Sequence, residues 1–400
     1  MTSLAQLKHR TVAILILLFF LTGQARAYDA SSSIGALLPD HSLPWFFVET
    51  FDDLMSRHWN EDGNWEEDVQ NDATAFAPEL LFALDATIRK DSGEGPGEFY
   101  RRAYQTGIWE KNLLKDAVSR FLQGGISDGE IFDTAVGTYS FLACAQFGLP
   151  ADAGYCRSIM KPIIKVANFF FLSPLFQWLG VFEGQEATLY SRLIFINLEY
   201  YKAFGQISYR DAAEKLARKL DRLANAEQGG LFEGNVFGWS QASPLVAYAS
   251  LYQATLNETY LEKANRLIAA LDRGYLFGKP DQTEAYWEFK HNELESNEEY
   301  WVLASSTHVQ FLEAFTILAI ATEDPYYLER ANRFLEFAVQ YLYIPYHGDS
   351  DTPHFAHDLS WPVNQSYPAY DEIQYNDWYC SGESFNFLRI AWKLLEFQRG

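Results

Sequence analysis

Apolar residues recur along most of this chain with helical spacing, and two kinds of helical pattern alternate. The segment 308–321 is apolar nearly all round, so a helix there must be buried on most sides. The segment 327–342 keeps apolar residues on one stripe and charged residues opposite, which predicts a helix with one face in water. Asp324 and Pro325 stand between them, suited to cap and to begin the second helix.

The second pattern is repeated along the chain, and this repeat is the strongest signal in the sequence. Tyr260-Leu-Glu-Lys-Ala-Asn-Arg-Leu267 nearly copies Tyr327-Leu-Glu-Arg-Ala-Asn-Arg-Phe334, and the segment 209–216 is a looser copy. The segment 114–121 is a fainter fourth copy. An apolar helical segment precedes each of the three clearer copies. The repeating unit is therefore a helical hairpin.

Extending this alternation over the chain predicts twelve helices and no series of strands. Six half-buried helices are expected at 45–57, 112–123, 155–171, 209–224, 260–271 and 327–343. Six buried helices are expected at 73–88, 134–146, 187–204, 244–255, 307–322 and 383–397. The pattern predicts an all-α fold, an (α/α)6 toroid in which an outer ring of helices surrounds an inner ring. An open solenoid would need polar capping helices, and the last segment is too apolar to be one, which favours closure of the ring.

The links between the predicted helices differ in length according to their direction. Links from a buried to a half-buried helix are mostly short, whereas the reverse links are mostly long and cover 58–72, 124–133, 172–186, 225–243, 272–306 and 344–382. In an alternating ring all the long links fall on one face. Long loops on a rigid scaffold usually carry binding and catalysis, so we expect the functional site on this face.

The N-terminal 27 residues have the features of a secretory signal peptide. Lys8, His9 and Arg10 precede the apolar run 11–21, and Ala25-Arg26-Ala27 has the form of a cleavage site. The apolar run is too short for a comfortable membrane span. We therefore expect an exported protein, periplasmic or extracellular, without membrane insertion, whose residues 28–400 form a single toroid domain.

The net charge of the chain is −22, and cleavage of the leader would make it more negative by removing three basic residues. Nucleic acid is a poor binding partner for a protein with such a negative electrostatic field. Cys144, Cys156 and Cys380 match no zinc or redox motif. Cys144 and Cys156 flank one predicted hairpin turn, where they could form a disulfide or remain buried thiols.

Aromatic and acidic residues gather in the long links. Eight of the 11 tryptophans lie in or at the edges of these links. Aromatic faces beside polar tips suit sugar rings, although such rings also pack long loops onto a scaffold. The residues that we expect to contact a substrate are Trp65, Trp239, Gln241, Trp287, Trp301, Trp378 and Tyr375.

No recognised cofactor motif is present. The sequence contains no G-x-G-x-x-G, P-loop, G-x-S-x-G or H-E-x-x-H, so nucleotide cofactors, serine-hydrolase chemistry and zinc-protease chemistry lack support. The segment 347–358 holds three histidines and three aspartates. It could bind calcium or zinc, or be an ordinary polar loop, because its spacing matches neither an EF-hand nor a known zinc motif. We therefore expect no cofactor and assign no metal ligands.

The pattern resembles the six-hairpin glycosidase superfamily, and the resemblance covers most of residues 28–400. It is carried by Ala321-Thr-Glu-Asp-Pro-Tyr-Tyr-Leu-Glu-Arg-Ala331 and the other tyrosine helices, which look like the phrase T-G-D-x-x-Y-L-x-x-A of that superfamily. The resemblance implies a toroid whose site lies at the N-terminal ends of the inner helices. The long links lead to that position here.

A narrower resemblance is to the unsaturated uronyl hydrolases, which carry an aspartate at the start of two successive inner helices. Asp72 and Asp133 stand in those places, and Gly238-Trp239-Ser240-Gln241 looks like the family segment W-S-R-G-Q, although its arginine and glycine are absent. The resemblance implies that Asp72 and Asp133 are the catalytic pair, one as general acid and the other as base or electrostatic stabiliser. The next candidates for catalytic carboxylates are Glu233, Asp377 and Glu66.

These features predict a carbohydrate-active enzyme, a glycoside hydrolase that cleaves oligosaccharides by carboxylate acid–base catalysis. Two alternatives stay open. A polysaccharide lyase would need a Tyr or His base and a cation beside the uronate, and the loop face has tyrosines but few basic residues. A non-catalytic glycan-binding toroid would keep the aromatic residues without a working acid and base.

Overall fold

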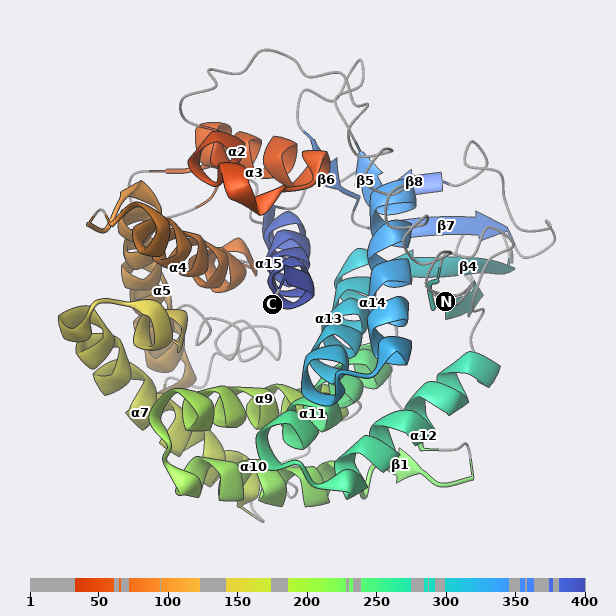
Figure 1. Cartoon of the computed structure of the whole chain (residues 1–400). Coiled ribbons are helices and arrows are strands. Elements are labelled where there is room, and N and C mark those ends of the chain that lie inside the picture. Colours follow the sequence, from red (N-terminus) through yellow and green to blue (C-terminus); the bar gives the residue numbers. More distant parts are fainter. Residues whose placement is uncertain are drawn as a thin grey trace, which may run out of the picture.

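A computed structural model of the chain shows a ring of helices (Figure 1). It describes residues 33–60, 65, 72–93, 95–122, 142–173, 186–227, 230–232, 239–274, 284–286, 288–291, 299–344, 353–356, 358–362, 374–376 and 381–399. A short helix, α2 (Ile34–Leu37), and a 3-10 turn, η1 (Pro39–His41), lie before the first long helix.

The long helices form two concentric layers. The inner layer contains the helical residues 142–147 and the helices α4 (Asp72–Ser92), α9 (Glu186–Phe204), α11 (Trp239–Thr255), α13 (Ser305–Thr322) and α15 (Ser381–Arg399). The outer layer contains α3 (Trp45–Arg57), α5 (Glu98–Leu122), α7 (Pro150–Leu172), α10 (Ile207–Leu220), α12 (Glu258–Gly274) and α14 (Pro325–Phe337). Within the described part, helices of the two layers alternate along the chain, as the sequence predicts.

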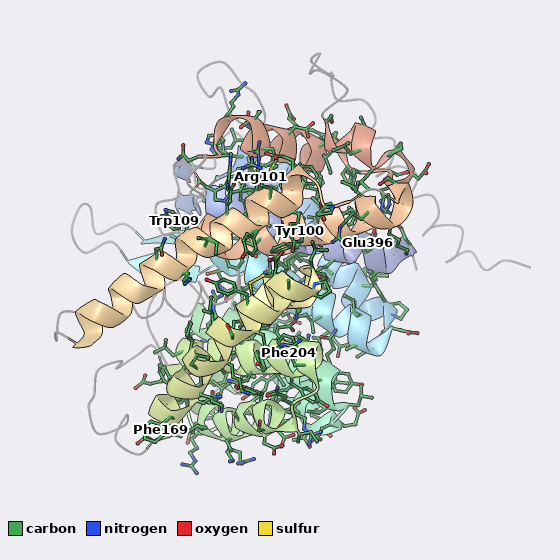
Figure 2. All side chains as sticks on the ribbon, turned by 90° about the vertical axis from the view of Figure 1, so that its left-hand side faces the viewer. Tyr100, Arg101, Trp109, Phe169, Phe204 and Glu396 are labelled. Atoms are coloured by element: carbon green, nitrogen blue, oxygen red, sulfur yellow. A yellow bond between two sulfur atoms is a disulfide. The ribbon has the colours of Figure 1, made fainter. Side chains whose placement is uncertain are left out.

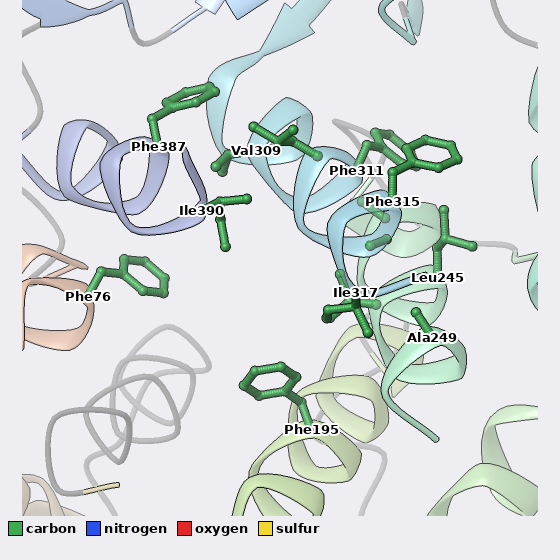
Figure 3. Packing of buried hydrophobic residues seen from close by; sticks show 14 of the residues in the cluster. Phe76, Phe195, Leu245, Ala249, Val309, Phe311, Phe315, Ile317, Phe387 and Ile390 are labelled. Carbon is green, nitrogen blue, oxygen red and sulfur yellow. The ribbon is translucent and has the colours of Figure 1, made fainter. Parts of the chain in front are cut away.

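The ring closes between its first and last inner helices. In the inner layer α9 packs on α11, α11 on α13, α13 on α15, and α15 on α4 (Figure 1). Figure 3 shows Phe76, Phe195, Ile317 and Ile390 reaching from four of these helices into the space that the ring encloses. Packing of α15 against α4 confirms closure and excludes the open solenoid.

The residue pattern explains why α13 and α14 take different layers. Fourteen residues of α13, from Ser305 to Ala319, are buried, because α11, α14 and α15 all pack against this helix. α14 instead exposes Glu329 and leaves Arg333 and Glu336 half-buried, whereas Arg330, on the face predicted to be in water, is buried. Asp324 caps it by accepting a hydrogen bond from the backbone N–H of Tyr326, and Pro325 occupies its first turn.

The repeated tyrosine motif joins neighbouring hairpins. Tyr327 at the start of α14 donates a hydrogen bond of 2.6 Å to Asn265, which belongs to the copy of the motif in α12. Tyr327 and Asn265 are thus partners across two repeats.

Several helix boundaries differ from the prediction. α5 begins at Glu98 instead of residue 112, and α7 begins at Pro150, where a first-turn proline is favoured. α11 begins at Trp239, five residues before Pro244. The regular part of α14 ends at Phe337 and continues as a π-helical turn, η2 (Ala338–Leu342). In the first three cases the helical period was predicted correctly and the start of the helix was misplaced.

The expectation of no strand series is wrong, because the long links contain short antiparallel strands. β3 (Glu288–His291), β4 (Glu299–Ala304), β7 (Asp358–Pro362) and β8 (Gln374–Asn376) form a sheet in the order β3-β4-β7-β8. Two-residue strands form two further pairs, β1 (Ala224–Asn225) with β2 (Leu231–Phe232), and β5 (Tyr343–Ile344) with β6 (His354–Phe355). β4 runs directly into α13, so the larger sheet lies at the N-terminal end of that inner helix.

Cys144 and Cys156 form a disulfide, which decides the alternative that the sequence left open. The bond joins the inner residues 142–147 to α7. Beside it, the hydroxyl of Tyr100 in α5 donates to Asp152 at 2.6 Å and accepts from the backbone N–H of Leu149 at 2.8 Å (Figure 2). The disulfide and Tyr100 together hold the short link between these helices.

Candidate functional site

The two faces of the ring differ in the length of their links. Links from an inner to an outer helix are 93–97, 148–149, 205–206, 256–257 and 323–324. Links that enter the described inner helices α4, α9, α11, α13 and α15 are 58–71, 173–185, 221–238, 275–304 and 343–380. The long links therefore converge on the N-terminal ends of the inner helices. This end of the ring, which we call the long-link face, is the candidate site.

Of the five predicted catalytic carboxylates, only Asp72 has a described backbone position. Asp72 is the first residue of α4, although its side chain is not among those described. Asp133, Glu233, Asp377 and Glu66 lie outside the described residues. Their catalytic roles stay predictions.

Five of the predicted binding residues lie among the described residues, and for three of these only the backbone position is defined. Trp239 begins α11, whereas Trp301 and Tyr375 lie in the sheet. The register places Trp301 opposite Phe289 on one side and Trp361 on the other, and it places Tyr375 opposite Leu359. Trp287 and Trp378 lie outside the described residues. The sheet thus brings aromatic positions from all four of its strands beside the N-terminal end of α13.

Trp65 is buried in packing contacts. Its side chain is among the largest of the fully buried ones, with 1% exposure. Its ring lies edge-on to the rings of Trp59 at 5.0 Å and of Phe385 at 4.5 Å between centroids. These contacts fasten the first long link to α15. A substrate contact by Trp65 stays a prediction, and the geometry shows a packing residue.

Gln241 binds the protein backbone. Its amide nitrogen donates to the carbonyl of Phe232 at 2.6 Å, and its amide oxygen accepts from the N–H of the same residue at 3.0 Å. This pair of bonds holds β2 against α11. Two residues farther, the hydroxyl of Ser243 donates to Gln310 of α13 at 2.6 Å. The polar residues at the start of α11 therefore fix its neighbours, and substrate binding by Gln241 stays a prediction.

A charged cluster that the sequence analysis missed joins three inner helices. One guanidinium nitrogen of Arg389 in α15 lies 2.8 Å from Glu79 in α4 and 2.9 Å from Glu313 in α13. Lys393 lies 2.6 Å from the other oxygen of Glu79. Each carboxylate interrupts an otherwise apolar segment of its helix. A charged residue in a helix that is apolar all round is the signal that could have revealed the cluster.

The electrostatics of this cluster favour a structural role. Burial alone would raise the pKa of Glu79, but the charges of Lys393 and Arg389 outweigh it and lower that pKa to about 2. A general acid near neutral pH needs a raised pKa instead. Glu79 is therefore a permanent anion that, with Glu313, ties α15 to two other inner helices.

His308 is the buried histidine of α13, and its environment is that of a core residue. Burial lowers its pKa to about 4, although a hydrogen bond to the carbonyl of Phe334 opposes the shift. Its Nε2 lies 2.7 Å from that carbonyl oxygen, and its ring stacks on the ring of Phe334 at 4.9 Å. His308 is neutral at ordinary pH and joins α13 to α14.

A cavity of about 510 Å³ lies at the opposite end of the inner ring. Its walls come from the middle and the C-terminal halves of α4 and α15 and from the last turn of α13, and they are mainly apolar. Glu79, Arg389 and Lys393 also line it. The cavity reaches as far as Glu79 and Arg389, near the middle of their helices, so the first seven residues of α4 lie between it and the long-link face.

Neither a metal cluster nor a membrane helix occurs in the described part of the chain. Among the described residues, no three His, Cys, Asp or Glu side chains are grouped to hold a metal ion. Most of the segment 347–358 lies outside these residues. No helix in the described segments is both long and apolar enough to cross a membrane.

Comparison with known proteins identifies the fold. No family model matches the sequence, and a sequence search of curated proteins gives no match. The structure is similar to that of a D-mannose isomerase, with a TM-score of 0.59 and 13% identity over 93% of this chain and 100% of that chain. The fold is an (α/α)6 toroid.

Two further toroids are similar over most of their length. Cellobiose 2-epimerase from Bacillus thermoamylovorans B4167 has a TM-score of 0.52 and 11% identity, over 88% of this chain and 96% of that chain. A glycosyl hydrolase family 88 protein from Bacteroides vulgatus has a TM-score of 0.51 and 10% identity, over 92% of this chain and 100% of that chain. These likenesses confirm the predicted all-α toroid.

Proposed function

We propose that this protein is a carbohydrate-active enzyme, a glycoside hydrolase that acts on oligosaccharides at the long-link face. The observation that carries the proposal is the convergence of the long links on the N-terminal ends of the inner helices. These links hold most of the tryptophans and many of the carboxylates of the chain. Aromatic faces stack on sugar rings, and carboxylates supply acid–base chemistry.

The reaction needs two carboxylic groups on opposite sides of the scissile bond. One protonates the leaving oxygen while the other, ionised, activates water or attacks the sugar. We assign these roles to Asp72 and Asp133. The start of α4 supports an anion at Asp72, because backbone N–H groups and the helix dipole favour negative charge there.

Asparagine variants test this pair. Asn caps a helix as well as Asp does, but it carries neither a proton nor a negative charge. Asp72→Asn and Asp133→Asn should each lower turnover by at least about a hundredfold, with little change in melting temperature. Near-normal turnover in both variants would show that the pair is wrong and would direct the same test to Glu233, Asp377 and Glu66.

A sugar isomerase or epimerase is the second candidate, because the similar toroids include a D-mannose isomerase and a cellobiose 2-epimerase. A glycan panel separates the candidates. New reducing ends indicate hydrolysis, ultraviolet absorbance indicates a lyase, and a changed sugar without bond cleavage indicates an isomerase or epimerase. Binding without any reaction would leave the non-catalytic toroid and exclude all three enzymes.

We also propose export to the periplasm or the cell exterior, with residues 28–400 as the mature domain. The disulfide between Cys144 and Cys156 supports this, because disulfides persist in oxidising compartments and are rare in the cytosol. Cleavage after Ala27 should leave Tyr28 as the first residue of the exported protein. An intact mass that retains the leader would contradict the proposal.

A further inference from the structure

The same side-chain arrangement, which we call the staple, occurs at two successive junctions between neighbouring hairpins of the ring. In the first staple, the ammonium of Lys263 in α12 lies 2.7 Å from Asp221 at the end of α10. The hydroxyl of Tyr248 in α11 donates to the same carboxylate at 2.9 Å. A cation, an aspartate and a tyrosine thus bind two outer helices together.

In the second staple, the guanidinium of Arg330 in α14 makes two bonds of 3.1 Å to Asp272 near the end of α12. The hydroxyl of Tyr286 donates to the same carboxylate at 2.6 Å. Arg330 follows the motif tyrosine of α14 at the same distance as Lys263 follows that of α12. The two aspartates also occupy equivalent positions, after Tyr209 and after Tyr260.

The second staple differs from the first because it also holds a long link. Nε of Arg330 lies 2.9 Å from Glu284, and another nitrogen donates to Tyr286 at 2.8 Å. Arg333 binds the second oxygen of Glu284 at 3.0 Å. Glu284 and Tyr286 lie in the link between α12 and α13, and both are almost fully buried. In the first staple the tyrosine comes from an inner helix instead.

The segment 284–286 leads directly to the sheet at the long-link face. β3 begins two residues later, with Glu288 opposite Val302 of β4. Val302 is in turn two residues before the end of β4, where the chain enters α13 (Figure 1). The β3-β4 hairpin is therefore attached to the ring at one end, through α13 on one strand and through Arg330 on the other.

We propose that Arg330 is a positioning residue for the long-link face: by holding Glu284 and Tyr286 it fixes the β3-β4 hairpin beside the N-terminal end of α13. This inference rests on the proposed function in assigning that sheet to glycan binding. The guanidinium suits the role because its planar fork bonds several acceptors at once, whereas an ammonium acts as a compact point charge. Lysine at the equivalent position of the first staple has only the helix-to-helix task.

Arg330 has two roles in the second staple: it joins α12 to α14, and it holds the link between α12 and α13. Arg330→Lys therefore tests these roles separately. The variant should keep a cation near Asp272 and the folded ring but lose the bonds from Arg330 to Glu284 and Tyr286, so that Arg333 alone holds Glu284. Amide hydrogen exchange of residues 284–304 should become at least about tenfold faster, with exchange elsewhere unchanged. Glu284→Gln, which removes the charge on the link and preserves its shape, should produce the same local increase.

Lys263→Ala is the matched control, because it breaks a staple whose side-chain contacts do not include the segment 284–304. It should leave exchange of residues 284–304 unchanged even if the melting temperature falls. The proposal is overturned if Arg330→Lys exchanges like the unsubstituted protein in this segment. It is also overturned if Lys263→Ala accelerates the segment equally, since that pattern would indicate general destabilisation.

A second measurement uses the oligosaccharide that gives the largest signal with the unsubstituted protein in the glycan panel. Arg330→Lys should raise KM for this sugar at least about tenfold and change kcat less, while Lys263→Ala should change neither. An unchanged KM in Arg330→Lys would refute the role of the hairpin in binding. If the unsubstituted protein binds no glycan, the proposed function fails, and the exchange experiment alone decides whether Arg330 positions the hairpin.

Discussion

Arg389 and Arg330 lie in two different regions of the toroid. Both form buried ion pairs, but these pairs have different structural roles. Each is almost fully buried and pairs with two carboxylates. Arg389 lies inside the ring and joins three inner helices, α4, α13 and α15. Arg330 lies in the outer layer and joins two outer helices to a link that enters the sheet. One arginine holds the scaffold, whereas the other connects the scaffold to the long-link face.

This difference predicts how a substitution in each region affects the protein. The charges of the inner cluster lie on three inner helices that pack together, so they cannot separate unless a helix moves. The outer cluster includes a segment of a long link, which can move away without opening the ring. Loss of Arg389 should therefore affect the whole fold, and a conservative change at Arg330 should affect mainly the site.

The largest effect is expected for Arg389→Ala. Removing the guanidinium leaves Glu313 and Glu79 buried with less compensation, and breaking a buried pair in this way costs about 3–5 kcal/mol. Urea unfolding should show this loss in the free energy of unfolding. Arg399→Ala is the control on the same helix, because its ion pair with Glu396 is partly exposed and should contribute at most about 1 kcal/mol. Equal losses in the two variants would contradict the comparison.

Lowering the pH should weaken the stabilisation from the inner cluster over a defined pH range. The pKa of Glu79 is about 2 in the folded protein, against an ordinary value of 4.5. A lowered pKa means that the stabilisation is complete above the ordinary value and is lost as the pH falls from about 4.5 toward 2. The free energy of unfolding should therefore decrease with acid over this range less steeply in Glu79→Gln than in the unsubstituted protein. Identical slopes would show that Glu79 does not contribute.

The smallest effect is expected at the start of α14, the helix that carries Arg330. Asp324→Ala removes the side chain that caps this helix and should cost about 1 kcal/mol, whereas Asp324→Asn should cost less because Asn also caps. Thermal unfolding measures both. Hydrogen exchange of residues 284–304 should stay unchanged in each variant. Faster exchange there would mean that the whole helix, and not Arg330, positions the link.

The sequence predicted the ring well because helical periodicity and repeated motifs are local signals. The segment expected at 307–322 is α13, Ser305–Thr322, and the two near copies of the tyrosine motif lie in α12 and α14. The sheet was missed for the opposite reason. β4 pairs with β7, which is more than fifty residues farther along the chain. A local sequence pattern does not indicate which distant strand will pair with it.

The candidate site was less predictable than the fold. Chain position placed Asp72 just before an inner helix, and it is the first residue of α4. Trp239 was expected in a long link and is instead the first residue of α11. The contacts of Gln241 and Trp65 depend on which residues lie beside them in space, and these partners, Phe232 and Phe385, come from other elements. Residue type alone could not distinguish a side chain that meets a substrate from one that packs a loop.

The most direct test of the account is a crystal structure of the Asp72→Asn variant with a bound oligosaccharide from the glycan panel. The account predicts the sugar at the long-link face, beside the N-terminal ends of the inner helices and within contact of residue 72 and the β3-β4 hairpin. Sugar bound instead in the cavity lined by Glu79, Arg389 and Lys393, at the opposite end of the ring, would contradict it.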